Sequence, residues 1–159
     1  MPRVLDALIY EHPFFDRALV LVEAEVREVV SRFRQTSPAA REAGGILIGY
    51  RRRSHLHIVE ATFPFERDRR SRFTFHREDS RHSQIASSRW AASNRRADYL
   101  GEWHTHPEER ATPSNIDVTE WRLILARASG PMLFWIAGIR TDWIGVGRGE
   151  VLKEAHLAD

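Results

Sequence analysis

The sequence contains no cysteine among its 159 residues. Disulfides, thiol nucleophiles and thiolate metal sites are therefore excluded, and any transition metal must be held by histidine, aspartate or glutamate. No apolar run approaches the ~20 residues of a membrane-spanning helix. Residues 1–15 contain neither a long apolar stretch nor the small-residue cleavage site of a secretory signal, so we expect a cytoplasmic protein.

Lysine is almost absent as well, because Lys153 is the one lysine among 24 basic residues. Twelve arginines fall within residues 51–96, against five acidic residues, although the net charge of the chain is only +2. Such a segment can be a solvated surface, a contact for a protein partner or a nucleic-acid surface, and composition alone does not decide between them.

The chain length suits one domain with a substantial core. Helical periodicity predicts helices at 23–35, 78–94 and 115–129. Apolar or alternating runs predict strands at 17–22, 45–50, 55–63, 73–75, 98–106, 132–139 and 142–149, with loops at 36–45 and 64–72. Because strands and helices mix without strict alternation, we expect an α+β or mixed α/β fold with helices packed on one sheet.

Two histidines stand one residue apart in GEWHTHPEERATPSNID, residues 101–117. Residues two apart in a strand share a face, so His104 and His106 project together until Pro107 ends the strand. Two imidazoles on one face make a pair of metal ligands, although an isolated pair of this kind more often has an ordinary structural role.

Asp117 follows His106 by eleven residues, across a turn that contains a proline. A chain reversal of this length can return the carboxylate to the imidazoles, which gives the two nitrogens and one oxygen of an open, catalytic zinc site. Ser114 precedes Asp117 by three residues, which is the spacing of a capping box at a helix start. The two interpretations are compatible, because a capped helix start fixes the direction of the aspartate.

A zinc hydrolase also needs a general base near its water molecule. Glu42 precedes two glycines at the start of a predicted strand, and Glu102 shares the strand face of the two histidines. Spacing alone does not choose between these two carboxylates. A second histidine pair, His55 and His57, has no proline to end its strand and no S-x-x-D pattern at a return distance, so we interpret it as structural.

These residues together resemble the JAMM motif of the MPN+/JAB metallopeptidases: Glu42 in EAGGILIG, then HTHP at 104–107, then Ser114 and Asp117 in PSNID. The resemblance covers about residues 17–148 and suggests a single JAB-type domain spanning 1–159. It implies a cytidine-deaminase-like mixed sheet flanked by helices.

The resemblance also implies a role for each matched residue. His104, His106 and Asp117 would bind one Zn²⁺, with water as the fourth ligand. Glu42, rather than Glu102, would be the general base, and Ser114 would help to stabilise the oxyanion. The substrate would be the amide bond after the C-terminus of a ubiquitin-like or similarly conjugated protein.

The absence of cysteine departs from those eukaryotic members that hold a second, structural zinc with cysteine. The absence of extra domains suggests a small standalone enzyme of bacterial type. YLGEWHTHPE, followed by Trp121, resembles the isopeptidase of type II CBASS anti-phage systems. That resemblance implies removal of conjugates from the C-terminus of a cGAS-like nucleotidyltransferase, with an operon-encoded E1–E2 enzyme as a further partner.

The sequence leaves two alternative functions open. One is a JAB peptidase that processes a small sulfur-carrier ubiquitin-like protein, and the other is a non-catalytic MPN scaffold. Scaffolds of this type have normally lost metal ligands, and this chain has kept all of them. Family resemblance assigns the predicted 64–72 loop to gripping the substrate's tail, through Arg67, Arg69, Arg70 and Arg72. We therefore favour a protein contact over nucleic acid for this segment and expect no membrane partner.

Overall fold

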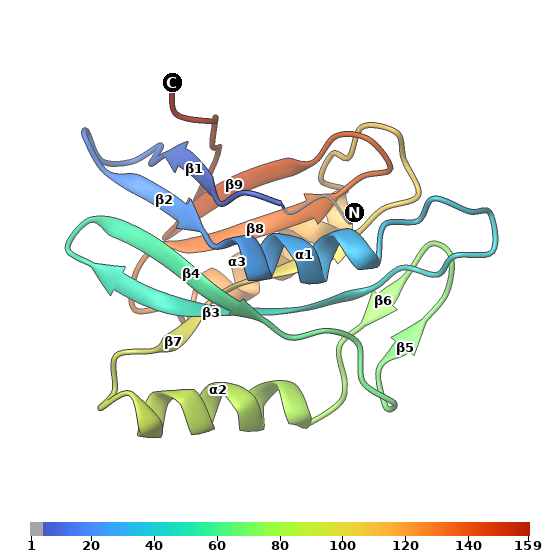
Figure 1. Ribbon diagram of the computed structural model, residues 1–159, viewed down its shortest axis with the longest axis horizontal. Helices are drawn as coiled ribbons and strands as arrows, with labels where there is room; N and C mark the ends of the chain where they lie inside the picture. Colours follow the sequence, from blue (N-terminus) through green and yellow to red (C-terminus); the bar gives the residue numbers. More distant parts are fainter. Residues whose placement is uncertain (1–4) are drawn as a thin grey trace.

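The computed structural model describes residues 5–159 (Figure 1). The first four residues of the predicted domain, which also belong to the segment considered as a secretory signal, lie outside the described residues. Eight strands form one sheet in the order β1-β2-β4-β3-β7-β8-β9-β10. The strands of this sheet are β1 (Leu8–Glu11), β2 (Leu19–Val22), β3 (Gly44–Arg52), β4 (His55–Ala61), β7 (Asp98–Thr105), β8 (Met132–Ala137), β9 (Trp143–Arg148) and β10 (Val151–Glu154). A separate short hairpin consists of β5 (Arg69–Arg70) and β6 (Phe75–His76).

The sheet is mixed and curled. Strands β2 and β4 are parallel, as are β7 and β8, while the other neighbours are antiparallel. The segment after β10 returns to β1, where Glu11 donates its backbone N–H to the His156 carbonyl at 2.9 Å and Ala158 donates to the Ile9 carbonyl at 2.9 Å. The two edges of the sheet are thereby joined, and the mixed sheet with its helices confirms the predicted fold class.

The three helices cover both faces of the sheet (Figure 1). Helix α1 (Ala24–Arg32) packs in the same apolar cluster as Trp135 of β8, while α3 (Asn115–Leu125) stacks Trp121 on Phe134 at 4.8 Å between ring centroids. Because Phe134 and Trp135 point to opposite faces, β8 is buried on both sides, which explains its uninterrupted apolar sequence. Helix α2 (Arg81–Ala92) packs on the α3 side, against Ile46 of β3.

No sequence pattern predicted β1, β10 or β5. Each has four residues or fewer and includes exposed positions, so none has the apolar run or clear alternation that identifies a strand. The strand predicted at 73–75 is β6, one to two residues later, and β5 lies within the predicted 64–72 loop. Among the described residues, no helix is long and apolar enough to cross a membrane.

Candidate metal and catalytic centre

The two histidines of HTHP stand at the end of β7 and face the same way, as the strand alternation predicts. Their Nε2 atoms lie 3.0 Å apart, and both side chains are largely buried. On the opposite face, Trp103 is fully buried in the core and donates its indole N–H to the Thr62 carbonyl. This anchoring fixes the strand, and with it the direction of the two imidazoles.

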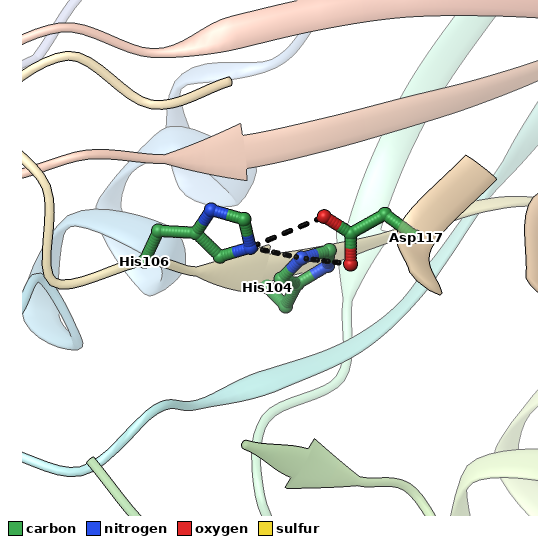
Figure 2. Close-up of side chains that lie close together, drawn as sticks. All are labelled: His104, His106 and Asp117. Carbon is green, nitrogen blue, oxygen red and sulfur yellow. Dashed lines mark hydrogen bonds and ion pairs between the residues drawn. The ribbon is translucent and has the colours of Figure 1, made fainter. Parts of the chain in front are cut away.

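The start of α3 brings Asp117 to these imidazoles. The Ser114 hydroxyl accepts the backbone N–H of Asp117 at 3.1 Å, and the Asp117 carboxylate accepts the backbone N–H of Ser114 at 2.7 Å. The predicted capping box is therefore confirmed. The same carboxylate lies 3.1 Å from His104 Nε2 and 3.2 Å from His106 Nε2 (Figure 2). The Asp117 carboxylate therefore belongs both to the helix cap and to the candidate metal site.

His104, His106 and Asp117, here called the His–His–Asp group, fit a zinc ion. The ligand atoms of the three side chains all lie within 4.8 Å of one another, and their closest separations are 3.0–3.2 Å. A tetrahedral zinc with bonds of about 2.0–2.1 Å separates its ligands by about 3.3–3.4 Å, so small outward movements would accommodate it. Nitrogen and carboxylate oxygen are also ligands that zinc accepts.

The electrostatics of the His–His–Asp group favour a positive charge at its centre. The pKa of Asp117 lies well below its usual range, because the hydrogen bonds from the two imidazoles outweigh the opposing effect of burial. Burial alone would lower the pKa of His106, but hydrogen bonds to Asp117 and Glu108 raise it to about 9. Glu108 Oε1 lies 2.7 Å from His106 Nδ1, and a carboxylate there directs Nε2 toward a metal.

Glu42 lies on the loop before β3 and is 6% exposed. Its neighbour Ala43 is held against β7, because Ala43 donates its N–H to the Thr105 hydroxyl and the Thr105 N–H donates to the Ala43 carbonyl. Burial raises the pKa of Glu42 to about 7, although the nearby His104 and His106 act in the opposite direction. A carboxyl group with this pKa can both take up and release a proton near neutral pH.

The two glycines after Glu42 permit a close approach of three strands. A Cβ added at Gly44 would lie 2.6 Å from the Trp103 carbonyl oxygen, and one at Gly45 would collide with the Thr62 carbonyl. Larger residues would therefore push β3 away from its neighbours. The two glycines thus allow the close backbone packing that holds the Glu42 loop beside β7.

Glu102, the competing carboxylate, has both oxygens engaged. Trp121 donates its indole N–H to one oxygen at 3.1 Å, and the Arg77 guanidinium donates to the other at 2.8 Å. Since the Trp121 ring also lies 6.2 Å from that of His104, Glu102 shares the side of the sheet that carries the metal-ligand candidates. Because both of its oxygens have fixed partners, Glu102 is suited to holding Arg77 and Trp121 in place rather than to moving protons.

Sequence reasoning missed Gln35, a polar residue only 1% exposed. Its amide N–H groups donate to the Ala40 and Arg72 carbonyls, and its carbonyl accepts the Thr105 hydroxyl at 2.8 Å. Gln35 thus connects the Glu42 loop, the β5–β6 hairpin and the histidine strand. A lone glutamine at a predicted helix end carries no sequence signal for such a role.

The four loop arginines lie on or beside the β5–β6 hairpin, next to the Glu42 loop. Arg70 donates to the Glu42 carbonyl at 2.7 Å, Arg72 donates to the Pro38 carbonyl at 2.6 Å, and Arg69 pairs with Glu78. Arg67 is exposed, and its backbone N–H donates to Asp79. Three of these guanidinium groups therefore contact the chain itself.

The second histidine pair has a different environment. His57 Nε2 lies 2.6 Å from Glu23, and His55 Nδ1 accepts the backbone N–H of Leu19 at 2.9 Å. These contacts connect β4 to the start of α1 and to β2, which is the structural role that the sequence suggested.

Comparison with known proteins identifies the class to which this fold and site belong. The model of the family of prokaryotic homologs of the JAB domain matches residues 23–146, so the chain belongs to this family. Among named relatives, it is 36% identical over 141 residues to the CD-NTase/cGAS isopeptidase of Escherichia coli (strain TW11681), covering 89% of this chain and 88% of that protein. It is 37% identical over 144 residues to the CD-NTase/cGAS isopeptidase of Pseudomonas aeruginosa (strain BWHPSA011 / Pa011), covering 87% and 91%.

A third relative, from Vibrio cholerae serotype O1, bears the same name and is 33% identical over 134 residues, which cover 84% of this chain and 85% of the relative. The solution structure of protein DSY2949 from Desulfitobacterium hafniense has a similar fold, with a TM-score of 0.54 over 80% of this chain and 83% of that one. At 20% identity, this likeness concerns the fold alone. The resemblance inferred from the sequence is thus confirmed at the level of the family and its isopeptidase relatives.

Proposed function

We propose that this chain is a zinc-dependent isopeptidase that hydrolyses the amide bond joining a protein C-terminus to its conjugate. The observation that carries the proposal is the convergence of His104, His106 and Asp117, with the Glu42 loop held against the same strand. Membership of the JAB family and the named isopeptidase relatives support it.

In this proposal the His–His–Asp group holds the zinc. A zinc ion bound there supplies Lewis acidity, which acidifies a water molecule and polarises the substrate carbonyl. Glu42 takes a proton from the attacking water and later delivers it to the leaving amine, for which its raised pKa suits it. Ser114 uses an oxygen lone pair for the helix cap, so its hydroxyl hydrogen can be donated to the developing oxyanion.

The substrate class comes from the relatives. Because three proteins with 33–37% identity are named CD-NTase/cGAS isopeptidases, we infer that the substrate is a conjugate at the C-terminus of a cGAS-like nucleotidyltransferase. An E1–E2 enzyme that makes the linkage would be the functional counterpart in antiviral defence. The hairpin with Arg67, Arg69, Arg70 and Arg72 lies beside the Glu42 loop, which is a position where it can guide the substrate's C-terminal tail.

A cleavage assay tests this proposal. The substrates are a nucleotidyltransferase conjugated at its C-terminus and a small sulfur-carrier protein fused through its C-terminal glycine to a reporter. We expect the zinc-loaded protein to release the nucleotidyltransferase with an intact C-terminus, and a chelator to abolish release until zinc is restored. Cleavage of the sulfur-carrier fusion alone would assign a different substrate, and cleavage of neither substrate would contradict the proposal.

A further inference from the structure

A second concave site lies where β3 ends and β7 begins. It is a cavity of about 360 Å³ lined by four arginines, two aromatic rings and one aspartate. The arginines and rings are Arg51, Arg52, Arg95, Arg96, Tyr50 and Trp90. The aspartate, Asp98, is six residues before His104 on β7, which corresponds to roughly 20 Å along a strand. This cavity is therefore separate from the catalytic centre.

The cationic groups of the cavity are incompletely neutralised. Arg51 is held by Asp98 at 3.2 Å and by the Pro131 carbonyl at 3.1 Å, which fixes its position in the wall. Arg95 and Arg96 are exposed, and within residues 5–159 neither guanidinium makes a hydrogen bond or an ion pair. The site thus carries several positive charges against a single carboxylate, which predicts an anionic ligand.

The turn that carries these two arginines is fixed by hydrogen bonds from its backbone N–H groups. The Ser93 hydroxyl accepts the N–H groups of Arg96 and Ala97, at 3.2 Å and 2.7 Å, and Arg95 donates its N–H to the Trp90 carbonyl at 2.9 Å. Arg95 also has a φ of 64°, a left-handed conformation that arginine rarely adopts. The backbone from which both arginines project is therefore held in place next to Trp90.

The aromatic rings indicate what kind of anion fits. The Arg52 guanidinium lies over the Tyr50 ring at 4.7 Å, and Trp90 is 41% exposed. Trp90 also lines a neighbouring cavity of about 420 Å³, whose wall is mainly apolar and includes Ala86 and Tyr99. A cationic cavity and a mainly apolar cavity thus meet at Trp90 and at Asp98, whose carboxylate pairs with Arg51.

We propose that these joined cavities bind a nucleoside phosphate, with the phosphate among the arginines and the base beside Trp90 and Tyr99. Guanidinium groups are the side chains best suited to bind phosphate, and an aromatic face accepts a planar base. Both volumes fall in the range of small-molecule sites, roughly 300–1,000 Å³. A strand of nucleic acid needs an extended cationic track, and an acidic peptide has no need of two rings, so a single nucleotide fits these features best.

Titration calorimetry with AMP and ATP tests this proposal, using the full chain. We expect saturable binding at one site per chain, and binding at least roughly 100-fold weaker in the Arg95→Glu/Arg96→Glu variant, because two charge-assisted contacts are lost. The matched control is Arg17→Glu/Arg127→Glu, which removes the same charge from exposed arginines outside the cavities and should bind as the wild type does. Trp90→Leu, which retains every arginine, should weaken AMP binding more than binding of inorganic phosphate.

Three results would overturn the proposal. These are an absence of AMP and ATP binding at millimolar concentration, an equal loss of binding in the control variant, or tighter binding of a thymidine oligonucleotide or polyglutamate than of either nucleotide. The last result would assign the arginines to a macromolecular partner. Because the test measures binding and not cleavage, its failure would leave the proposed isopeptidase function unaffected.

Discussion

Among single residues, Glu42 and Glu102 were both candidates for the general base, and their surroundings distinguish them where sequence spacing could not. Glu42 is buried and has its pKa raised to about 7, while both oxygens of Glu102 accept hydrogen bonds from Arg77 and Trp121. A general base must be able to gain and lose a proton during each turnover, so the proposed role suits Glu42. Glu102 instead fixes the tryptophan that packs beside His104.

Ser114 has two proposed tasks that substitution can separate. Ser114→Ala removes the helix cap, which should cost about 1 kcal/mol of unfolding free energy, and it also removes the oxyanion donor. We expect kcat to fall by at least tenfold, because a lost oxyanion donor typically costs more than that. Urea denaturation and steady-state cleavage measure the two effects.

Ser114→Gly is the matched variant, since glycine in place of serine at a helix N-cap costs only a few tenths of a kcal/mol but supplies no side-chain donor. It should nearly retain the stability of the wild type and still lose kcat. Full activity in this variant would remove the hydroxyl from the mechanism.

At the scale of secondary-structure elements, the site depends on how three segments are held together. Strand β7 carries the histidines, the start of α3 carries Asp117, and the loop before β3 carries Glu42. The buried contact between Gln35 and the Thr105 hydroxyl joins the loop to the strand. Thr105 lies between the two histidines in sequence, so a shift there would move the ligands relative to Glu42.

We therefore predict that Thr105→Val, which keeps the shape but lacks the hydroxyl, lowers kcat at least tenfold while zinc content is retained. Displacement of a reacting group by about 1 Å can cost roughly 100-fold in rate. The Ala43 N–H and the Gln35 carbonyl would lose their partner, which should also cost about 1–3 kcal/mol in stability. Kinetics, denaturation and metal analysis of one preparation check all three expectations.

Thr105→Ser keeps the hydroxyl and should remain close to the wild type in rate. In a double-mutant cycle with Gln35→Leu, the effects on kcat should be clearly less than additive, because both changes break the same contact. Additive effects would show that Gln35 and Thr105 act independently and would contradict the positioning role.

At the scale of the whole molecule, periodicity predicted the elements that lie in the core. The all-apolar run 132–139 and the alternating run 55–63 correspond to β8 and β4, because burial on two faces or one face leaves a direct pattern. Strands β1 and β10 escaped prediction, since short edge strands are held by pairing with neighbours rather than by a buried face. Both strands pair with a neighbour that is close in the chain, but few of their own residues are buried, so no buried face leaves a periodic pattern in the sequence.

For the candidate site, local spacing predicted the features formed by residues close in sequence but not those that depend on distant segments. The spacing of HTHP and of Ser114 to Asp117 predicted both the shared strand face and the capping box. Glu42 could be selected over Glu102 by family resemblance alone, because its position depends on a pairing across about sixty residues. Gln35 could not be found, since its role exists only once the loop, the hairpin and β7 are assembled.

Tyr10, a buried tyrosine, contributes to the pH dependence of stability. Burial, with Asp142 nearby, raises the pKa of Tyr10 from 10.0 to about 12. Well below pH 10 the phenol is neutral in both the folded and the unfolded chain, so its full contribution to the free energy of unfolding is present. Between pH 10 and 12 it ionises in the unfolded chain first, so stability falls by up to about 2–3 kcal/mol. Urea denaturation at pH 9 and at pH 11.5 measures the fall, which should be smaller in Tyr10→Phe; an unchanged fall would assign it to other groups.

The proposed mechanism requires the His–His–Asp group to hold a zinc ion while Glu42 transfers the proton. The most direct test measures zinc content and cleavage rate in the same preparations of wild type and Glu42→Gln. We predict close to one zinc per chain in both proteins, and a cleavage rate at least about 100-fold lower in the variant. A zinc-loaded Glu42→Gln protein that cleaves at the wild-type rate, or a wild type that cleaves without bound metal, would contradict the proposed mechanism.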